Sequence, residues 1–413
     1  MNQTIYPIGI QNFEKIRKDG YLYVDKTALV YQLANTGSYY FLSRPRRFGK
    51  SLLLSTLEAY FQGKKELFEG LAIANLEKEW MEYPILHLDL NAEKYSDAGA
   101  LESILRRFLN LWEDRWGKDD RETTPSDRFT GVIRRAYEKT GRRVVVLVDE
   151  YNKPLLQALE NAELQEAILK AFYGVLKTMD GYIRLAFLTG VTKFGKVSVF
   201  SDLNNLDDIS MREPYAAICG ITEAELLTYF DGDIHKLASS LELTYDETRS
   251  LLKKRYDGYH FVANVPGIYN PFSLLNTFKY MRPEDYWFET GTPSYLVELL
   301  KHTHYDLYEL ANTETDADVL NSIDSTSSNP VPVIYQSGYL TIKDYDSRFG
   351  IYKLGFPNLE VEEGFVKYLL PFYTSVSAPK TPFEIGRFVR EVENGDYDAF
   401  FRRLQSFFAD TPY

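Results

Sequence analysis

The chain has 413 residues, of which 45% are hydrophobic, and it carries a formal net charge of −12 and one cysteine. Because this length exceeds the size at which one core stops growing, we expect two or three domains. The acidic balance argues against binding nucleic acid by bulk charge, and a single cysteine excludes an intrachain disulfide and a cysteine zinc cluster. The sequence contains no long apolar run. We therefore expect no signal peptide, no membrane span and a reducing, cytoplasmic setting.

The first predicted helix covers residues 28–34 and follows the segment Tyr-Leu-Tyr-Val-Asp-Lys-Thr at residues 21–27. Two interpretations of this segment stay open. Asp25 can serve as the N-cap of the helix, because a short carboxylate accepts a hydrogen bond from a free N–H of the first turn. Alternatively, the segment lies beside the base of a nucleotide that is bound by the motif following it.

That motif is Ser-Arg-Pro-Arg-Arg-Phe-Gly-Lys-Ser at residues 43–51, between an apolar strand over residues 39–42 and an amphipathic helix. This order is the context of a phosphate-binding loop, because free N–H groups at a helix N-terminus bind anions. Lys50 would then reach the β- and γ-phosphates, and Ser51 would ligate Mg²⁺. Arg44 stands where the standard pattern has glycine. A basic surface turn before an amphipathic helix is therefore the alternative at this point.

Residues 84–90 predict a second buried strand with a polar end. Apolar residues at helical spacing then predict one helix over residues 101–112 and another over residues 129–137. We expect the charged stretch between them, residues 114–127, to form a loop.

The clearest strand covers residues 144–148, five consecutive β-prone apolar residues followed by Asp149 and Glu150. An unbroken apolar run is typical of a central parallel strand, and ligands bind at the carboxyl ends of such strands. Asp149 is predicted to hold Mg²⁺, directly or through water, and Glu150 to polarise the attacking water. A helix-capping acidic turn is the alternative for this pair alone, but the upstream Gly-Lys-Ser favours a nucleoside-triphosphate site.

The next predicted strand covers residues 183–190 and ends in polar residues. In ATPases that carry an extra strand between the P-loop strand and the acid-pair strand, a residue here senses the γ-phosphate. Thr189 is our candidate, and Lys193 is the second choice. The short apolar stretch at residues 216–219 is expected to supply a fifth strand. Helical connections predict a parallel α/β sheet, in the order 5-1-4-3-2 by analogy with such P-loop NTPases.

The second half of the chain reads as mostly helical up to about residue 325. Thr222 and Glu225 form a capping box that opens the first of these helices. Further on, a short helix over residues 331–337 and two strands around a polar turn suggest a winged-helix-like module, for which packing or regulation and DNA contact are the alternatives. The predicted domains are a P-loop core (1–220), a helical lid (221–325), the winged-helix-like module (326–375) and a helical tail (376–413).

Several motifs together resemble the AAA-ATPase-like family of bacterial proteins, and the resemblance covers nearly the whole chain. The motifs are residues 23–27, 44–52, 147–151, 188–194, 256–259, 287–293 and 336–340. Arg-Pro-Arg-Arg-Phe-Gly-Lys-Ser is that family's own variant of the loop, which explains Arg44. Family members commonly carry a PD-(D/E)XK nuclease-like domain after the helical tail. We find no strand-borne Asp followed by Glu-x-Lys, so nuclease activity is not expected from this chain.

Residue patterns and resemblance together predict an ATP-binding, Mg²⁺-dependent P-loop ATPase that acts as a nucleotide-driven switch, coupled to a protein partner or to a C-terminal nuclease-like domain. The alternatives are a nucleotide-gated binding module with little turnover, and a winged-helix protein that binds nucleic acid. Arg46 or Arg47 either offsets transition-state charge in cis or makes structural ion pairs. The predicted ATP-binding residues are Pro45, Arg46, Arg47, Phe48, Gly49, Lys50, Ser51 and Leu52. The predicted Mg²⁺ ligands are Ser51 and Asp149, and the predicted catalytic residues are Glu150, Lys50, Arg47 and Thr189.

Overall fold

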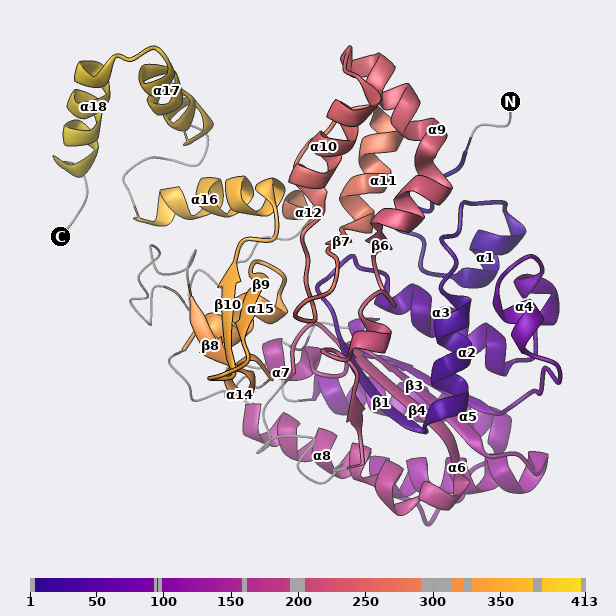
Figure 1. Ribbon diagram of the computed structural model, residues 1–413. Helices are drawn as coiled ribbons and strands as arrows, with labels where there is room; N and C mark the ends of the chain where they lie inside the picture. The colour runs from indigo at the N-terminus through magenta and orange to yellow at the C-terminus, as the bar shows by residue number, and fades with distance from the viewer. Residues whose placement is uncertain are drawn as a thin grey trace.

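The computed structural model describes residues 4–92, 95, 99–157, 162–193, 205–290, 300, 313–321, 329–373 and 381–409 (Figure 1). The predicted domain boundaries at 325/326 and 375/376 lie outside the described residues. So do residue 194 and residues 291–293 of the family motifs.

A five-stranded sheet forms the centre of the molecule, in the order β2-β3-β4-β1-β5, and every neighbouring pair is parallel. The chain is therefore an α/β protein with the P-loop NTPase sheet, and the predicted order 5-1-4-3-2 is confirmed. Every residue of β3 is buried, as its unbroken apolar run predicts. The strands are β1 (Tyr39–Ser43), β2 (Ile85–Asp89), β3 (Val144–Asp149), β4 (Ile183–Gly190) and β5 (Asp207–Asp208).

The identity of the fifth strand differs from the prediction. The edge strand is Asp207–Asp208, which pairs with β1, whereas the apolar stretch at residues 216–219 forms turns. The prediction was wrong because burial alone does not make a strand. The apolar residues of this stretch enter the core without pairing with β1, and the stretch ends at Gly220, whose N–H donates to the carbonyl oxygen of Phe48.

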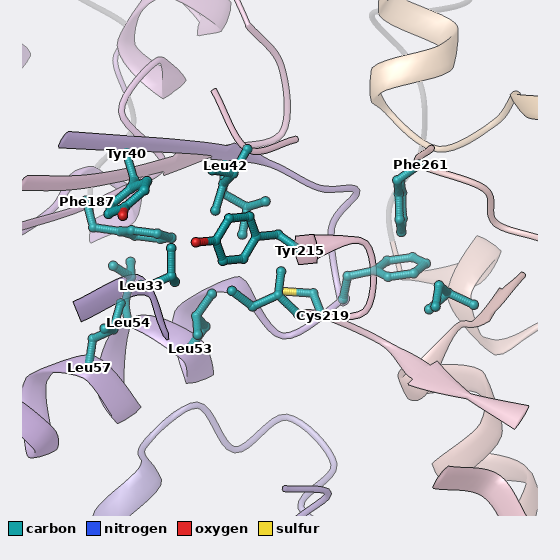
Figure 2. Close-up of a cluster of buried hydrophobic side chains, with 14 of the residues drawn as sticks. Leu33, Tyr40, Leu42, Leu53, Leu54, Leu57, Phe187, Tyr215, Cys219 and Phe261 are labelled. Carbon is teal, nitrogen blue, oxygen red and sulfur yellow. The ribbon is translucent and has the colours of Figure 1, made fainter. Parts of the chain in front are cut away.

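Helices cover both faces of the sheet, and alternate residues of β3 feed two separate cores. Val145 and Leu147 pack in the core on the side of α1 (Phe13–Lys18), α2 (Thr27–Thr36) and α3 (Lys50–Phe61). Figure 2 shows Leu53, Leu54 and Leu57 of α3 in this core, to which Leu42 of β1 also belongs. Val144, Val146 and Val148 pack in the core on the side of α5 (Ala100–Trp116), α6 (Pro125–Thr140) and α8 (Ala162–Thr178). Both α5 and α6 extend into the predicted charged loop, which is correspondingly shorter.

A helical lid stands over one end of the sheet in Figure 1. Thr222 caps its first helix, and the predicted capping box with Glu225 is present. The lid has its own apolar core. Its elements are β6 (Ile221–Thr222), α9 (Glu223–Leu241), α10 (Tyr245–Tyr256), β7 (Ile268–Tyr269), α11 (Pro271–Tyr280) and α12 (Tyr286–Glu289).

A three-stranded antiparallel sheet with two short helices follows the lid, in the order β8-β10-β9. The predicted helix and two strands are present, and the third strand comes from residues N-terminal to 326. These elements are β8 (Glu314–Asp316), α14 (Ala317–Asn321), α15 (Val331–Gln336), β9 (Thr341–Asp346) and β10 (Ile351–Gly355). The tail helices are α16 (Leu359–Tyr373), α17 (Thr381–Glu393) and α18 (Tyr397–Ala409).

Short helical turns complete the described chain: η1 (Lys65–Phe68), α4 (Ile73–Leu76), η2 (Leu90–Ala92), α7 (Lys153–Gln157), η3 (Asp180–Tyr182) and η4 (Glu213–Tyr215). In the part of the chain that the structure describes, no helix combines the length and apolar character needed to cross a bilayer.

Candidate nucleotide-binding site

The predicted phosphate loop, residues 44–49, joins β1 to the N-terminus of α3. Gly49 is the N-cap and has a φ of 98°, in the left-handed region that favours glycine. Arg47 also has a positive φ, 65°, which costs a non-glycine residue about 1 kcal/mol and persists only where neighbours hold it. The loop therefore presents the free N–H groups of α3 at the carboxyl edge of the sheet, where an anion can bind.

Arg44, which replaces the usual glycine, is a buried brace, with only 1% of its surface exposed. Its guanidinium donates to the carbonyl oxygens of Ser210 at 2.8 Å and Tyr215 at 3.2 Å. It also lies 4.1 Å from the ring centroid of Phe261. Burial lowers the pKa of this guanidinium. Arg44 thus ties the start of the loop to the segment after β5, and its side chain is committed to these contacts.

Five predicted site residues come together at the ends of β3, β4 and the loop. Ser51 Oγ donates to Asp149 Oδ2 at 2.5 Å, and Thr189 Oγ1 donates to Oδ1 of the same carboxylate at 2.7 Å. Lys50 Nζ lies 3.3 Å from Glu150 Oε1. Lys50, Asp149 and Thr189 are buried. The cluster combines one ammonium group, two carboxylates and two hydroxyls, whose oxygens are of the kind that coordinates divalent metals.

Lys50 also curls back onto its own loop. Its ammonium donates to the carbonyl oxygens of Arg44 at 3.0 Å and Pro45 at 3.3 Å. These two carbonyl contacts and the ion pair with Glu150 are the partners that a phosphate would replace.

Glu150 reaches Lys50 because the chain turns sharply after β3. Glu150 has a φ of 51°, and its N–H donates to Asp149 Oδ1 at 3.0 Å. The next N–H, from Tyr151, donates to the carbonyl oxygen of Thr189 at 2.9 Å. The turn is therefore held by the neighbouring strand, and it places the glutamate carboxylate beside the loop rather than along the strand axis.

Lys193, the second choice for the sensor, lies away from these contacts. Its ammonium pairs with Asp208 of β5 at 2.5 Å, and its N–H donates to Gln336 Oε1 at 2.7 Å. Lys193 therefore connects β5 to α15, whereas Thr189 is hydrogen-bonded within the cluster.

The two remaining loop arginines face the C-terminal half of the chain. Arg46 donates to the hydroxyl of Tyr339 at 2.9 Å, and its guanidinium carbon lies 5.4 Å from a ring centroid of Trp287. The guanidinium carbon of Arg47 lies 5.1 Å from the ring centroid of Phe272, on α11. Both guanidinium groups therefore lie against aromatic side chains, and the predicted cis role for these arginines stays a prediction.

A largely apolar pocket of about 660 Å³ opens beside Gly49 and the first turn of α3. Residues 22–24, residues 218–221 and the lid helices α9 and α11 form its other walls. Asp25, next to these residues, accepts hydrogen bonds from the N–H and the hydroxyl of Thr27, at 2.8 and 2.7 Å. The N-cap of α2 is Lys26, so the prediction of Asp25 as N-cap was wrong, although Asp25 accepts two hydrogen bonds from the first residue of the helix. Residues 22–24 line the pocket, and their place beside a nucleotide base stays a prediction.

Sequence reasoning did not single out Trp287 or Glu360, although both are tied to the loop. The indole N–H of Trp287 donates to the carbonyl oxygen of Arg46 at 3.0 Å. Glu360, at the start of α16, accepts from the N–H of Trp287 at 2.7 Å and from Ser273 Oγ at 2.8 Å. The available signal was the family motif that begins at residue 287. The Glu360 contact spans 73 residues in sequence, and no local pattern indicates it.

We expect the fold to lose stability as the pH rises, because burial raises the pKa of Glu360 to about 8. Hydrogen bonds from Trp287 and Ser273 oppose this rise, and the nearby Asp285 adds to it. A carboxyl group whose pKa is raised by folding stabilises the folded state while it is protonated. This contribution is fully present below the unfolded pKa, near 4.5, and is lost as the pH rises through the folded pKa, near 8. The free energy of unfolding, measured with urea, should decrease by up to about 4 kcal/mol between pH 5 and 8.5. Glu360→Gln should flatten that slope, and an equally steep slope in this variant would contradict the assignment.

Comparison with known proteins places the chain in a family. Residues 7–200 match the AAA-ATPase-like family, which is described as "Predicted AAA-ATPase". A relative from Azotobacter chroococcum mcd 1, described as an uncharacterized protein in the vnfD 5'region, is 37% identical over 420 residues, covering 100% of this chain and 79% of the relative. The chain belongs to the AAA-ATPase-like family. All five residues of the cluster lie in the matched segment.

A solved structure, that of the Aeropyrum pernix ORC2 protein in ADPNP–ADP complexes, aligns over 89% of this AAA-ATPase-like chain and 97% of its own. The identity is 12% and the TM-score is 0.30. Membership of the AAA-ATPase-like family supports a nucleotide-binding P-loop ATPase.

Proposed function

We propose that this AAA-ATPase-like chain binds ATP with Mg²⁺, hydrolyses it, and uses the nucleotide state as a switch for a partner or a further domain. The observation that carries the proposal is the cluster of Lys50, Ser51, Asp149, Glu150 and Thr189 at the N-terminus of α3. Each residue supplies one of the functions that phosphoryl transfer to water requires: charge neutralisation, metal ligation, water activation and γ-phosphate contact.

Lys50 and the backbone N–H groups of residues 46–52 hold the phosphates. The ammonium exchanges its contacts with the Arg44 and Pro45 carbonyls and with Glu150 for phosphate oxygens, which are stronger partners for a cation. This exchange also releases Glu150. Phosphate binding and the availability of the base are thereby linked through one side chain.

The oxygen pair of Ser51 and Asp149 fits Mg²⁺, because hydroxyl and carboxylate oxygens are the hard ligands that this ion prefers. When bound, the metal would neutralise charge on the β- and γ-phosphates. Thr189, now bonded to Asp149, orients that carboxylate and can turn its hydroxyl to a γ-phosphate oxygen. Glu150 orients the attacking water and accepts its proton.

The apolar pocket beside Gly49 takes the adenine base. We expect Leu275→Trp, which adds bulk to the α11 wall of this pocket, to weaken ATP binding about tenfold, which is about 1.4 kcal/mol. Binding of inorganic tripolyphosphate, which has no base, should not change. Isothermal titration with both ligands measures this, and Leu275→Met is the matched control. Equal weakening of both ligands would show that the pocket does not hold the base.

A second candidate function is a nucleotide-gated binding module with little turnover. The ion pair between Lys50 and Glu150 favours it, since a base held by the lysine is not free to act on water. ATP binding without phosphate release in the presence of Mg²⁺ would select this candidate. The winged-helix alternative is tested by titrating the chain with DNA, because DNA binding through phosphate contacts should weaken as the salt concentration rises.

A further inference from the structure

Four consecutive residues of the phosphate loop each pack against a different residue of the C-terminal half. Gly338, just after α15, approaches so closely that a Cβ there would lie 2.7 Å from Pro45 Cβ. Its φ of 90° also disfavours any other residue. The contacts are Pro45 with Gly338, Arg46 with Trp287 and Tyr339, Arg47 with Phe272, and Phe48 with Tyr259.

Trp287 is the most constrained of these partners. It is fully buried, and its backbone N–H is fixed by Glu360 of α16. Its indole N–H donates to the carbonyl oxygen of Arg46, in the phosphate loop, at 3.0 Å. Its ring also packs against Tyr339, 5.4 Å away between centroids. The backbone of Trp287 is thus held by α16, while its indole is held by the phosphate loop and by Tyr339, which lies just before β9.

The Arg46 carbonyl that accepts this hydrogen bond belongs to the peptide unit that joins Arg46 to Arg47. In a trans peptide the C=O and the N–H point in opposite directions, and none of the described peptide bonds is cis. Because the Arg46 carbonyl points to Trp287, the Arg47 N–H points away from Trp287. That N–H is one of the backbone donors assigned to phosphate, so the indole contact controls the orientation of a phosphate donor.

We propose that Trp287 is a positioning residue of the phosphate site, and that its bond to the Arg46 carbonyl transmits nucleotide occupancy to the lid and the C-terminal strands. The inference rests on the proposed function, because it requires phosphate in the loop. Coupling is reciprocal. Contacts that hold Trp287 in place strengthen nucleotide binding, and nucleotide binding in turn changes the surroundings of the indole.

The first test measures ATP affinity by titration in a Glu150→Gln background, where turnover does not interfere. Trp287→Phe keeps an aromatic ring but loses the indole N–H. It should weaken ATP binding about fivefold, as expected for one neutral hydrogen bond. Tyr339→Phe leaves that bond in place and should have a smaller effect. Trp112→Phe, in the core on the other face of the sheet, should have none.

The second test keeps Trp287 and therefore does not depend on whether Trp287→Phe folds. The chain has four tryptophans, and replacing Trp80, Trp112 and Trp116 by phenylalanine leaves Trp287 as the sole indole emitter. Saturating ATP should shift or quench its emission. Unchanged emission together with wild-type ATP affinity in Trp287→Phe would overturn the inference while the proposed function stands. Failure of the wild-type chain to bind ATP would overturn both.

Discussion

Replacing Glu150 by glutamine is expected to slow steady-state ATP hydrolysis by about 10²–10³-fold while ATP still binds. Glutamine keeps the size of the side chain but cannot accept a proton from the attacking water. The change also removes the ion pair with Lys50, so ATP affinity should stay the same or rise. Phosphate release at saturating ATP and a separate titration with ATP measure the two effects.

Glu138→Gln is the matched control, because Glu138 is an exposed carboxylate on α6, outside the cluster. It should hydrolyse ATP at the wild-type rate. If Glu150→Gln binds ATP and hydrolyses it as fast as the wild type, Glu150 is not the base. If it binds no ATP, the Glu150 carboxylate contributes to binding, which the account does not predict.

Among the substitutions, replacement of Arg128 by methionine has the largest expected effect on the free energy of unfolding, a loss of about 3 kcal/mol. Arg128 on α6 donates to both carboxylate oxygens of Glu113 on α5, at 2.7 Å each, and to Asn110 Oδ1 at 2.6 Å. The exposed fractions of the Arg128 and Glu113 side chains are 10% and 4%. Methionine would leave the Glu113 carboxylate buried without its cation. The midpoint of urea unfolding measures the loss.

Two controls separate this pair from a general effect of removing an arginine. Arg121→Met removes an arginine whose side chain is 89% exposed and pairs with Asp119 at the surface, and it should leave stability unchanged. Glu113→Leu combined with Arg128→Met should recover most of the loss, because no unpaired charge stays buried. A single Arg128→Met variant as stable as the wild type would contradict this assignment.

The sequence predicted those parts of the fold that local patterns determine. The apolar runs of β1, β3 and β4 match the observed strands because a central parallel strand must be apolar on both faces. The capping box of Thr222 and Glu225 was predictable because its two residues lie three positions apart in the sequence. Gly49 to Ser51 and the acid pair at Asp149 also carried enough information to predict that they meet, since both follow parallel strands.

Other parts depend on contacts between distant segments. β5 consists of two aspartates, and its strand conformation comes from pairing with β1 rather than from any apolar pattern. The arginines of the loop are the clearest case. Their charge suggested either phosphate contact or structural ion pairs. In the structure, Arg44 donates hydrogen bonds to backbone carbonyls, and Arg46 contacts Trp287 and Tyr339, which lie more than 200 residues away in the chain. A local charge pattern carries no information about aromatic partners so far away in the sequence.

ATP binding at Lys50 is the central claim of the proposed function. Isothermal titration of the wild-type chain and Lys50→Ala with ATP and Mg²⁺ tests this claim most directly, with the exposed Lys65→Ala as the control. We expect saturable binding by the wild type and by Lys65→Ala. Lys50→Ala should bind about 100-fold more weakly, because charge-assisted hydrogen bonds to phosphate are lost. No ATP binding by the wild type, or equal affinity in Lys50→Ala, would contradict the account.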